Sequence, residues 1–190
     1  MQNKPDVEKA IMQAFKQLVK TTPPAKITIK EITDMAHVIR PTFYNHFQDK
    51  YELIERIIKQ EILEPVRPLL ANDMIDEAMV LIFTNLQKDK EFYMKIVRTS
   101  GQNSFEEITT SCVEELLLEV LEAKIGQKVV KDKWLTPQML AKYYARSMTF
   151  VVMNWIESGM PLSPREIAEI YDYIITRSMQ DMIAELQEQE

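Results

Sequence analysis

The stretch TIKEITDMAHVIRPTFYNHFQDK, residues 28–50, decides the fold of this chain. It predicts two short helices joined by a tight turn and followed at once by the start of a third. Thr28 and Glu31 form a capping box, in which each side chain satisfies an exposed backbone donor at a helix start. Ile29, Ile32 and Ala36 then fall at helical spacing on one face, which predicts a short helix packed against a core.

The second helix of this stretch carries two inward aromatics and a polar outer face. It opens at Arg40-Pro41-Thr42 with the proline in the first turn, where its missing N–H is harmless. Phe43 and Phe47 lie four residues apart and face the core, which leaves for the solvent side Arg40, Thr42, Tyr44, Asn45 and His46. A short helix of this kind suits insertion into the major groove of double-stranded DNA.

At these residues the chain closely resembles the TetR family of bacterial transcription regulators. The matching pieces are ITIKEITDMA at 27–36 and RPTFYNHFQDK at 40–50, of which the second is the more diagnostic. The resemblance implies that the helix around Arg40–His46 reads bases and that the Lys50 end of the following helix clamps phosphate. It assigns base contacts to Arg40, Pro41, Thr42 and Asn45, and phosphate contacts to Thr28, Lys30, Tyr44, His46 and Lys50. Residues 155–164 and the turn at His37 resemble the branch of the family that includes a dihydroxyacetone-kinase activator.

Two residues depart from the family pattern. The family usually has glycine where His37 stands and often serine where Ile39 stands. We expect His37 to hold the turn with a positive φ, a conformation in which histidine is enriched among non-glycine residues. Ile39 has no side-chain oxygen, so the recognition helix is expected to start through a backbone contact.

Length and composition bound the class of protein. The chain has 190 residues, 46% apolar and 27% charged, an ordinary balance for a soluble globular protein. It has 3 glycines, which predicts an all-α fold. No apolar run approaches a membrane span, and the N-terminus has no apolar signal segment. Cys112 is the single cysteine, which fits a reducing, cytoplasmic location and excludes an intramolecular disulfide.

Charge is distributed unevenly along the chain. The net charge is −6, but residues 1–60 carry +3 and residues 61–190 carry −9. A basic end on an acidic body favours nucleic acid at one end only. Lys9, Lys16 and Lys20 are assigned to the outer faces of the first helix, where a solvated role is favoured over phosphate contact. Lys50 lies in the first turn of its helix, where the helix dipole disfavours a positive charge. A phosphate at the same position would be favoured by both the dipole and the ammonium group, which favours Lys50 as a phosphate ligand.

The periodicity predicts about nine helices in two domains. Residues 1–49 form the helix-turn-helix DNA-binding domain and residues 50–190 a helical ligand-binding and dimerisation domain, with a connecting helix at about 50–64. Pro65 and Pro68 end or kink that helix. The expected helices span about 5–21, 28–36, 40–47, 50–63, 73–88, 90–99, 105–125, 136–158 and 163–186.

The second domain is assigned by resemblance to effector binding and dimerisation. Flexible methionine and aromatic side chains suit a pocket for small apolar molecules, although the core reading is favoured for any one of them. The expected pocket residues are Met79, Phe83, Phe92, Val97, Phe105, Ile108, Cys112, Tyr144, Met148 and Trp155. The last two helices are expected to pair across a two-fold axis through Val152, Ile156, Ile170, Ile174 and Met182.

The function expected from these observations is a homodimeric transcription regulator, a repressor released by a small apolar effector, on a palindromic operator. A helical module that senses a protein partner is the alternative. An enzyme is not expected: His37 and His46 are the two histidines, and zinc spacing, G-x-S-x-G, a phosphate loop and a dinucleotide fingerprint are all missing from the sequence. No cofactor or metal is expected.

Overall fold

The structure is a computed structural model that describes residues 4–99, 104–125 and 134–187. Every regular element in these ranges is helical, which confirms the all-α prediction. The described part holds eleven α-helices where nine were expected. The two additional helices come from a short α5 (Arg67–Ala71) after the connecting helix and from a break in the last predicted helix.

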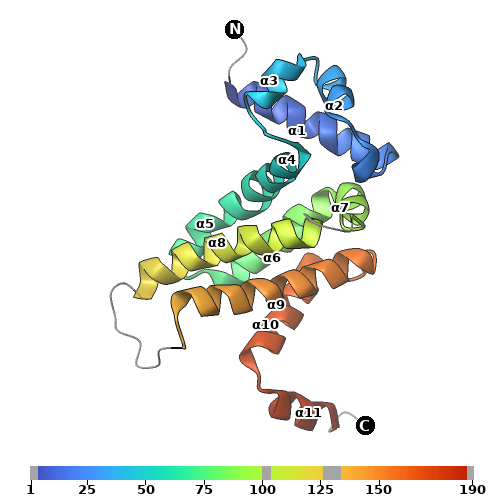
Figure 1. Ribbon diagram of the computed structural model, residues 1–190. Coiled ribbons are helices and arrows are strands. Elements are labelled where there is room, and N and C mark those ends of the chain that lie inside the picture. Colours follow the sequence, from blue (N-terminus) through green and yellow to red (C-terminus); the bar gives the residue numbers. More distant parts are fainter. Residues whose placement is uncertain (1–3, 100–103, 126–133, 188–190) are drawn as a thin grey trace.

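The first three helices form a compact unit at one end of the molecule (Figure 1). They are α1 (Lys4–Thr21), α2 (Ile29–Met35) and α3 (Arg40–Tyr44), with a 3-10 turn η1 (Pro24–Lys26) between the first two. Their shared core is fully buried and contains Phe15, Ile32, Phe43 and Phe47. The two aromatics predicted to anchor α3 do so, with ring centroids 5.5 Å apart.

The connecting helix leads from this unit into the body. It begins as α4 (Lys50–Ile57), widens into a π-helical segment η2 (Ile58–Leu63), and ends in the 3-10 turn η3 (Glu64–Val66) before α5. Pro65 explains the widening, because it has no N–H for the carbonyl of Glu61 and its ring crowds that carbonyl. The side-chain amide of Asn85 donates to this carbonyl at 3.2 Å instead. The predicted proline kink is therefore a π segment that starts before the proline.

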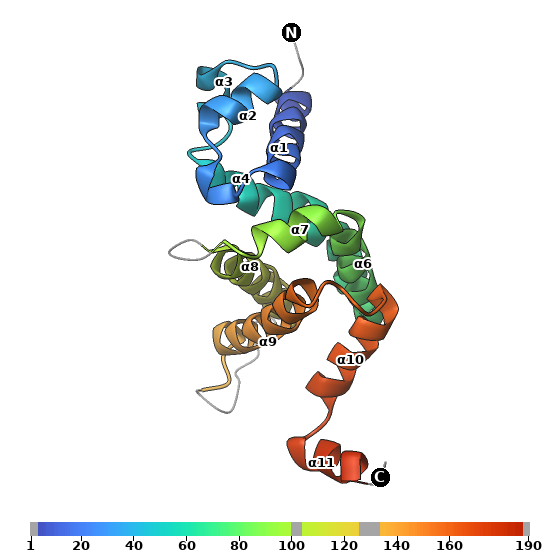
Figure 2. The ribbon, with the colours of Figure 1, turned by 90° about the vertical axis from the view of Figure 1, so that its right-hand side faces the viewer.

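The body consists of α6 (Ile75–Lys88), α7 (Lys90–Ile96), α8 (Phe105–Ile125), α9 (Pro137–Glu157) and α10 (Pro164–Thr176). In both ribbon views α8 lies along α9, and α6 packs between the connecting helix and α10 (Figures 1 and 2). No helix among the described residues is long and apolar enough to cross a membrane.

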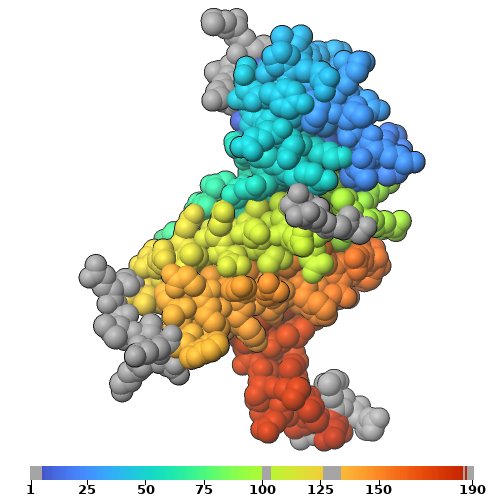
Figure 3. Space-filling view, in the orientation of Figure 1, coloured from blue at the N-terminus to red at the C-terminus, as the bar shows by residue number. Residues whose placement is uncertain are grey.

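The last predicted helix, 163–186, is wrong as one continuous element. It breaks at Arg177, whose backbone is extended, and α11 (Met179–Gln187) follows. Ser178 starts the new helix, since its hydroxyl accepts from the Asp181 N–H at 3.1 Å. As a result α11 projects from the body (Figure 3), held to the end of α10 by a hydrogen bond of 2.6 Å from the Tyr173 hydroxyl to Glu185.

Side-chain caps fix the starts of α2, α4, α9 and α10. The capping box predicted at Thr28 is present, and Ser163 forms a second one with Glu166 at the start of α10. Asp49 caps α4 by accepting from the N–H groups of Tyr51 and Glu52. Asp49 and Glu52 do not form a full capping box, because Glu52 accepts from the N–H of Gln48, at 2.7 Å, rather than from that of Asp49.

Candidate nucleic-acid interface and effector cavity

The turn between α2 and α3 is closed without the family's glycine. His37 has φ +54°, as expected. Its N–H donates to the Asp34 carbonyl at 3.3 Å, and the N–H of Val38 donates to the Thr33 carbonyl at 3.0 Å. This pair of bonds is the Schellman motif, which ends α2 and turns the chain sharply into α3.

Helix α3 starts through its backbone, also as expected. Ile39 makes no side-chain cap, and its carbonyl accepts from the N–H of Thr42 at 2.9 Å. Phe43 is fully buried beneath the helix. The residues predicted to read bases lie on the opposite side, where Arg40, Pro41 and Asn45 are exposed and Thr42 is half-buried. Whether they contact bases stays a prediction, but the structure brings them to one outward surface.

The predicted phosphate contacts divide into two groups. Thr28, Lys30 and Tyr44 are exposed beside the α3 surface. The Thr28 hydroxyl also belongs to the cap of α2, and Lys30 pairs with Asp34 at 2.8 Å on the open surface.

The other two phosphate candidates have partners inside the protein. The Lys50 ammonium donates to the carbonyls of Pro24, Ala25 and Ile27 at 2.9, 3.1 and 3.4 Å, and burial lowers its pKa. Lys50 thus closes the end of η1. The expectation that His46 faces solvent is wrong: its side chain is 8% exposed and its Nδ1 lies 4.0 Å from a carboxylate oxygen of Glu8. His46 follows the end of α3, where the chain turns back toward α1.

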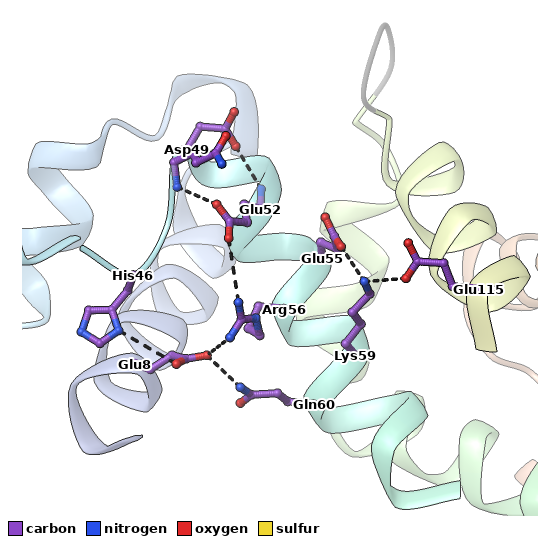
Figure 4. Close-up of polar contacts among 10 residues, drawn as sticks. Glu8, His46, Asp49, Glu52, Glu55, Arg56, Lys59, Gln60 and Glu115 are labelled. Atoms are coloured by element: carbon purple, nitrogen blue, oxygen red, sulfur yellow. Dashed lines mark hydrogen bonds and ion pairs between the residues drawn. The ribbon is translucent and has the colours of Figure 1, made fainter. Parts of the chain in front are cut away.

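Glu8 on α1 is the centre of a polar cluster that fixes the unit of α1, α2 and α3, called the reading unit from here on, to the connecting helix (Figure 4). Its carboxylate accepts from Arg56 at 2.8 Å and from Gln60 at 2.7 Å. One turn along, Lys59 joins Glu55 on its own helix to Glu115 on α8, both at 2.7 Å. Burial opposes the charge of Lys59, but the two carboxylates outweigh it and raise the pKa of Lys59. The connecting helix is therefore tied to α1 on one side and to α8 on the other.

A second cluster ties α1 directly to the body. The Lys16 ammonium pairs with Glu61 at 2.6 Å and also with Asp89, and it lies 5.8 Å from the centre of the Phe92 ring. The Lys16 side chain is only 4% exposed. Its assignment to an outer face of the first helix is wrong. Lys16 lies four residues after Met12 and three before Val19, so it belongs to the apolar face, and this spacing is the signal that identifies it.

Behind this cluster lies a small cavity of about 20 Å³, which is room for about one water molecule. Five elements line it: η2, α6, α7, α8 and α9. The lining residues are Ile58, Ile62, Leu63, Ile82, Leu86, Tyr93, Phe105, Thr109, Val113, Met148, Thr149 and Val152.

Of the ten predicted pocket residues, the structure brings Phe105 and Met148 together in this wall. Phe83 and Trp155 meet edge to face with ring centroids 5.2 Å apart, and Phe92 meets Phe15 of α1 edge to face. Cys112 is buried elsewhere, Val97 is half-buried, Met79 and Ile108 line surface grooves, and Tyr144 is partly exposed. Sequence reasoning missed Tyr93 and Thr149, because it selected side chains for apolar size rather than for their hydroxyls.

Two predicted dimer residues lie in the subunit core. Val152 and Ile156 are 5% and 0% exposed, because this face of α9 packs inward, so their assignment to a dimer interface is wrong. Ile170 and Ile174 on α10 are each 41% exposed, and Met182 on α11 is half-buried. On α9 the most exposed apolar residues are instead Tyr143 and Phe150, at 63% and 65%.

Comparison with known proteins agrees with this architecture. Residues 11–57 match the family model described as bacterial regulatory proteins of the tetR family, and residues 73–177 match a transcriptional regulator C-terminal region of the same family. These matches confirm the resemblance seen in residues 27–50.

Individual relatives support the same conclusion. A transcriptional activator of the dhaKLM operon from Lactococcus lactis, DhaS, is 32% identical over 94 residues, which cover 47% of this chain and 48% of the activator. The match thus spans about half the length of that relative. A solved structure of the dihydroxyacetone kinase operon activator DhaS aligns at a TM-score of 0.58 and 23% identity, covering 90% of this chain and 94% of the other. Thermus thermophilus FadR, a repressor solved with lauroyl-CoA, aligns at a TM-score of 0.61 and 17% identity, covering 90% and 94%. At identities of 23% and 17%, these structural similarities show that the fold is shared.

Proposed function

The chain belongs to the TetR family of bacterial transcription regulators, and we propose that it is a homodimeric repressor that binds a palindromic operator and is released by a small apolar effector. The observation that carries the DNA-binding proposal is the presentation of α3. Phe43 is fully buried under the helix, while Arg40 and Asn45 are exposed on its outer side. This arrangement matches a recognition helix that enters the major groove.

We assign base contacts to Arg40, Pro41, Thr42 and Asn45, and phosphate contacts to Thr28, Lys30 and Tyr44. Lys50 and His46 are assigned mainly to positioning, since both already have partners within the protein. The +3 charge of residues 1–60 against −9 for the remainder favours an approach of this end to DNA.

A two-fold dimer is supported by the exposed apolar side of α9 and α10. One three-helix reader contacts too few base pairs for useful specificity, and two readers on one duplex overcome this limit. Tyr143, Phe150, Ile170 and Ile174 are all at least 41% exposed. The proposed interface therefore keeps Ile170 and Ile174 from the sequence prediction and replaces Val152 and Ile156 by Tyr143 and Phe150.

The dimer proposal is tested by light scattering on the wild type and on Phe150→Asp. We expect a dimer of the 22.3 kDa chain for the wild type and a monomer with weakened DNA binding for the variant. Arg165→Ala is the matched control, because Arg165 is exposed on α10 and its ion pair, with Glu169 at 2.9 Å, lies within the same helix. A monomeric wild type at micromolar concentration would refute the dimer.

The DNA-binding proposal is tested with duplex DNA from upstream of the chain's own gene. Affinity should fall steeply with salt, since phosphate contacts release counterions. Arg40→Ala should cost about 1–3 kcal/mol at one base position and relax sequence preference there, whereas Lys30→Ala should weaken all sequences alike. No salt-dependent affinity for any duplex would refute the proposal.

The small cavity supports a second candidate function. At about 20 Å³ it holds no effector as it stands, so the regulator could respond to a protein partner instead. In that case no small molecule would raise the melting temperature of the protein, whereas a binding protein would alter its affinity for DNA.

A further inference from the structure

The cavity beneath the connecting helix is lined by two hydroxyl groups that make no hydrogen bond to the described residues. Tyr93 on α7 and Thr149 on α9 both line it, and both are buried, at 0% and 2% exposed. Neither Tyr93 Oη nor Thr149 Oγ1 has a hydrogen-bond partner among the described residues. A buried hydroxyl without a partner is unfavourable, so such groups in a native protein call for a physical explanation.

Three other threonines bond to the backbone of their own helices, whereas Thr99 Oγ1, which does not line the cavity, also lacks a hydrogen-bond partner among the described residues. Thr109, in the same cavity wall, donates to the Phe105 carbonyl of its own helix at 2.7 Å. Thr84 and Thr110 make the equivalent bond to the carbonyl four residues earlier. Thr149 lies in the middle of α9 and makes no such bond. Its hydroxyl is therefore available to a group that enters the cavity.

The charges around the cavity select against an ionised ligand. Among the described residues no charged side chain lines it, and the two carboxylates that act on Tyr93, those of Glu61 and Asp89, already share the Lys16 ammonium. Burial, together with these two carboxylates, raises the pKa of Tyr93, so Tyr93 is a neutral hydroxyl that can donate as well as accept. An anion would find no cation here, and an ammonium would lose its hydration to apolar walls.

We propose that Tyr93 and Thr149 recognise the oxygen of an uncharged, otherwise apolar molecule, and that this molecule is the effector of the regulator. The inference rests on the proposed effector-released function and gives it a ligand class. In the present structure the cavity admits about one water molecule, so the apolar part of the effector must displace part of the wall. Ile58, Ile62 and Leu63 of η2 form one side of that wall, and a displaced η2 carries Glu61 with it.

The test uses phenol and toluene, which share a shape and differ in a hydroxyl against a methyl group, together with benzoate and benzylammonium. Binding to the full-length protein without DNA is measured by calorimetry and by the melting temperature. We expect phenol to bind about tenfold more tightly than toluene, the gain from one or two hydrogen bonds, and neither ion to bind.

Variants separate recognition from packing. Tyr93→Phe and Thr149→Val each remove a hydroxyl and keep the shape, so each should reduce the preference for phenol over toluene. Both should also raise the melting temperature of the protein alone, since an unsatisfied group is removed. Thr110→Val is the control, because its hydroxyl is bonded to the Glu106 carbonyl outside the cavity, and it should keep the full preference.

Three results would overturn the proposal: an unchanged preference in both cavity variants, tighter binding of benzoate or benzylammonium than of phenol, or no binding of any probe, which would leave a resident water only. Binding of the unliganded protein to its upstream DNA is measured in parallel. Intact DNA binding with a failed probe test refutes the ligand class alone, whereas lost DNA binding refutes the function on which it rests.

Discussion

Replacing Lys16 by methionine tests whether the reading unit and the body are one cooperative structure. Lys16 is the residue of α1 whose buried ammonium contacts both Glu61 of the connecting helix and Asp89 between α6 and α7. Methionine keeps most of the side-chain stem against Phe92 and removes only the charge. We therefore expect a variant that folds, with a weakened contact between α1 and the body.

The magnitude follows from the geometry of the pair. At the 2.6 Å between Lys16 Nζ and Glu61 Oε2, the Coulomb attraction is about 6 kcal/mol at an effective dielectric constant of about 20. Burying the ammonium, which is 4% exposed, offsets several kcal/mol of this. Glu61 and Asp89 remain 27% and 34% exposed, so water can solvate them after the substitution. We expect a net loss of about 2 kcal/mol, below the 3–5 kcal/mol that is typical when a fully buried pair is broken.

Urea unfolding followed by two probes measures this loss. Trp134 and Trp155 are the two tryptophans, both in the body, so tryptophan fluorescence reports on the body while far-ultraviolet circular dichroism reports on every helix. The two transitions should coincide in the wild type and separate in Lys16→Met, with part of the helical signal lost first.

Lys30→Met is the matched control for this experiment. Lys30 pairs with Asp34 at 2.8 Å, a similar distance, but its side chain is 72% exposed. An exposed pair of this kind contributes little to stability, because water and salt screen its two charges. If Lys16→Met destabilises the protein no more than Lys30→Met, and the two probes stay coincident, the reasoning about the contact between α1 and the body is refuted.

Three further predictions concern single sites. Asn85→Leu removes the amide that donates to the Glu61 carbonyl at 3.2 Å, and it should lower the free energy of unfolding in urea by about 1 kcal/mol. Asn154→Leu is the control, because that amide donates to the Phe150 carbonyl of its own helix at the protein surface, and it should cost less. Equal losses in the two variants would contradict the role given to Asn85. Thr28→Ala removes the cap of α2 and should also cost about 1 kcal/mol, while an unchanged urea midpoint would show that the cap is dispensable. Stability should fall above about pH 9, because burial raises the pKa of the Cys112 thiol from 9.0 to about 12 and that of Tyr171 from 10.0 to about 12. Each group keeps its proton in the folded chain after the unfolded chain has lost it, so its contribution to stability is complete below the ordinary pKa and is lost as the pH rises through the raised pKa. A urea midpoint that stays level from pH 8 to 11 would refute this. Cys112 should also resist alkylation at pH 8 until the protein unfolds.

The sequence was sufficient to predict features set by local spacing. Phe43 and Phe47 lie one helical turn apart, which determines that they share a face, and Thr28 with Glu31 determines where α2 begins. Packing between distant helices was not predictable in this way. Both faces of α9 carry apolar residues, so periodicity alone could not tell that Val152 packs inward while Phe150 stays exposed. Lys16 was missed because its charge argued for solvent, whereas its partners, Glu61 and Asp89, lie 45 and 73 residues away in the chain.

The same short segment of helix carries the wall of the cavity and the contact to the reading unit. Within η2, Ile58, Ile62 and Leu63 face the cavity, and Glu61 holds Lys16 of α1. The π conformation of this segment arises because Pro65 removes one helical hydrogen bond, and Asn85 stabilises the carbonyl that is left over. A segment that already lacks a regular bond can change its winding at lower cost than an unbroken helix. Under the proposed function, a molecule that widens the cavity displaces η2, and the Glu61–Lys16 pair is a contact through which this displacement reaches α1.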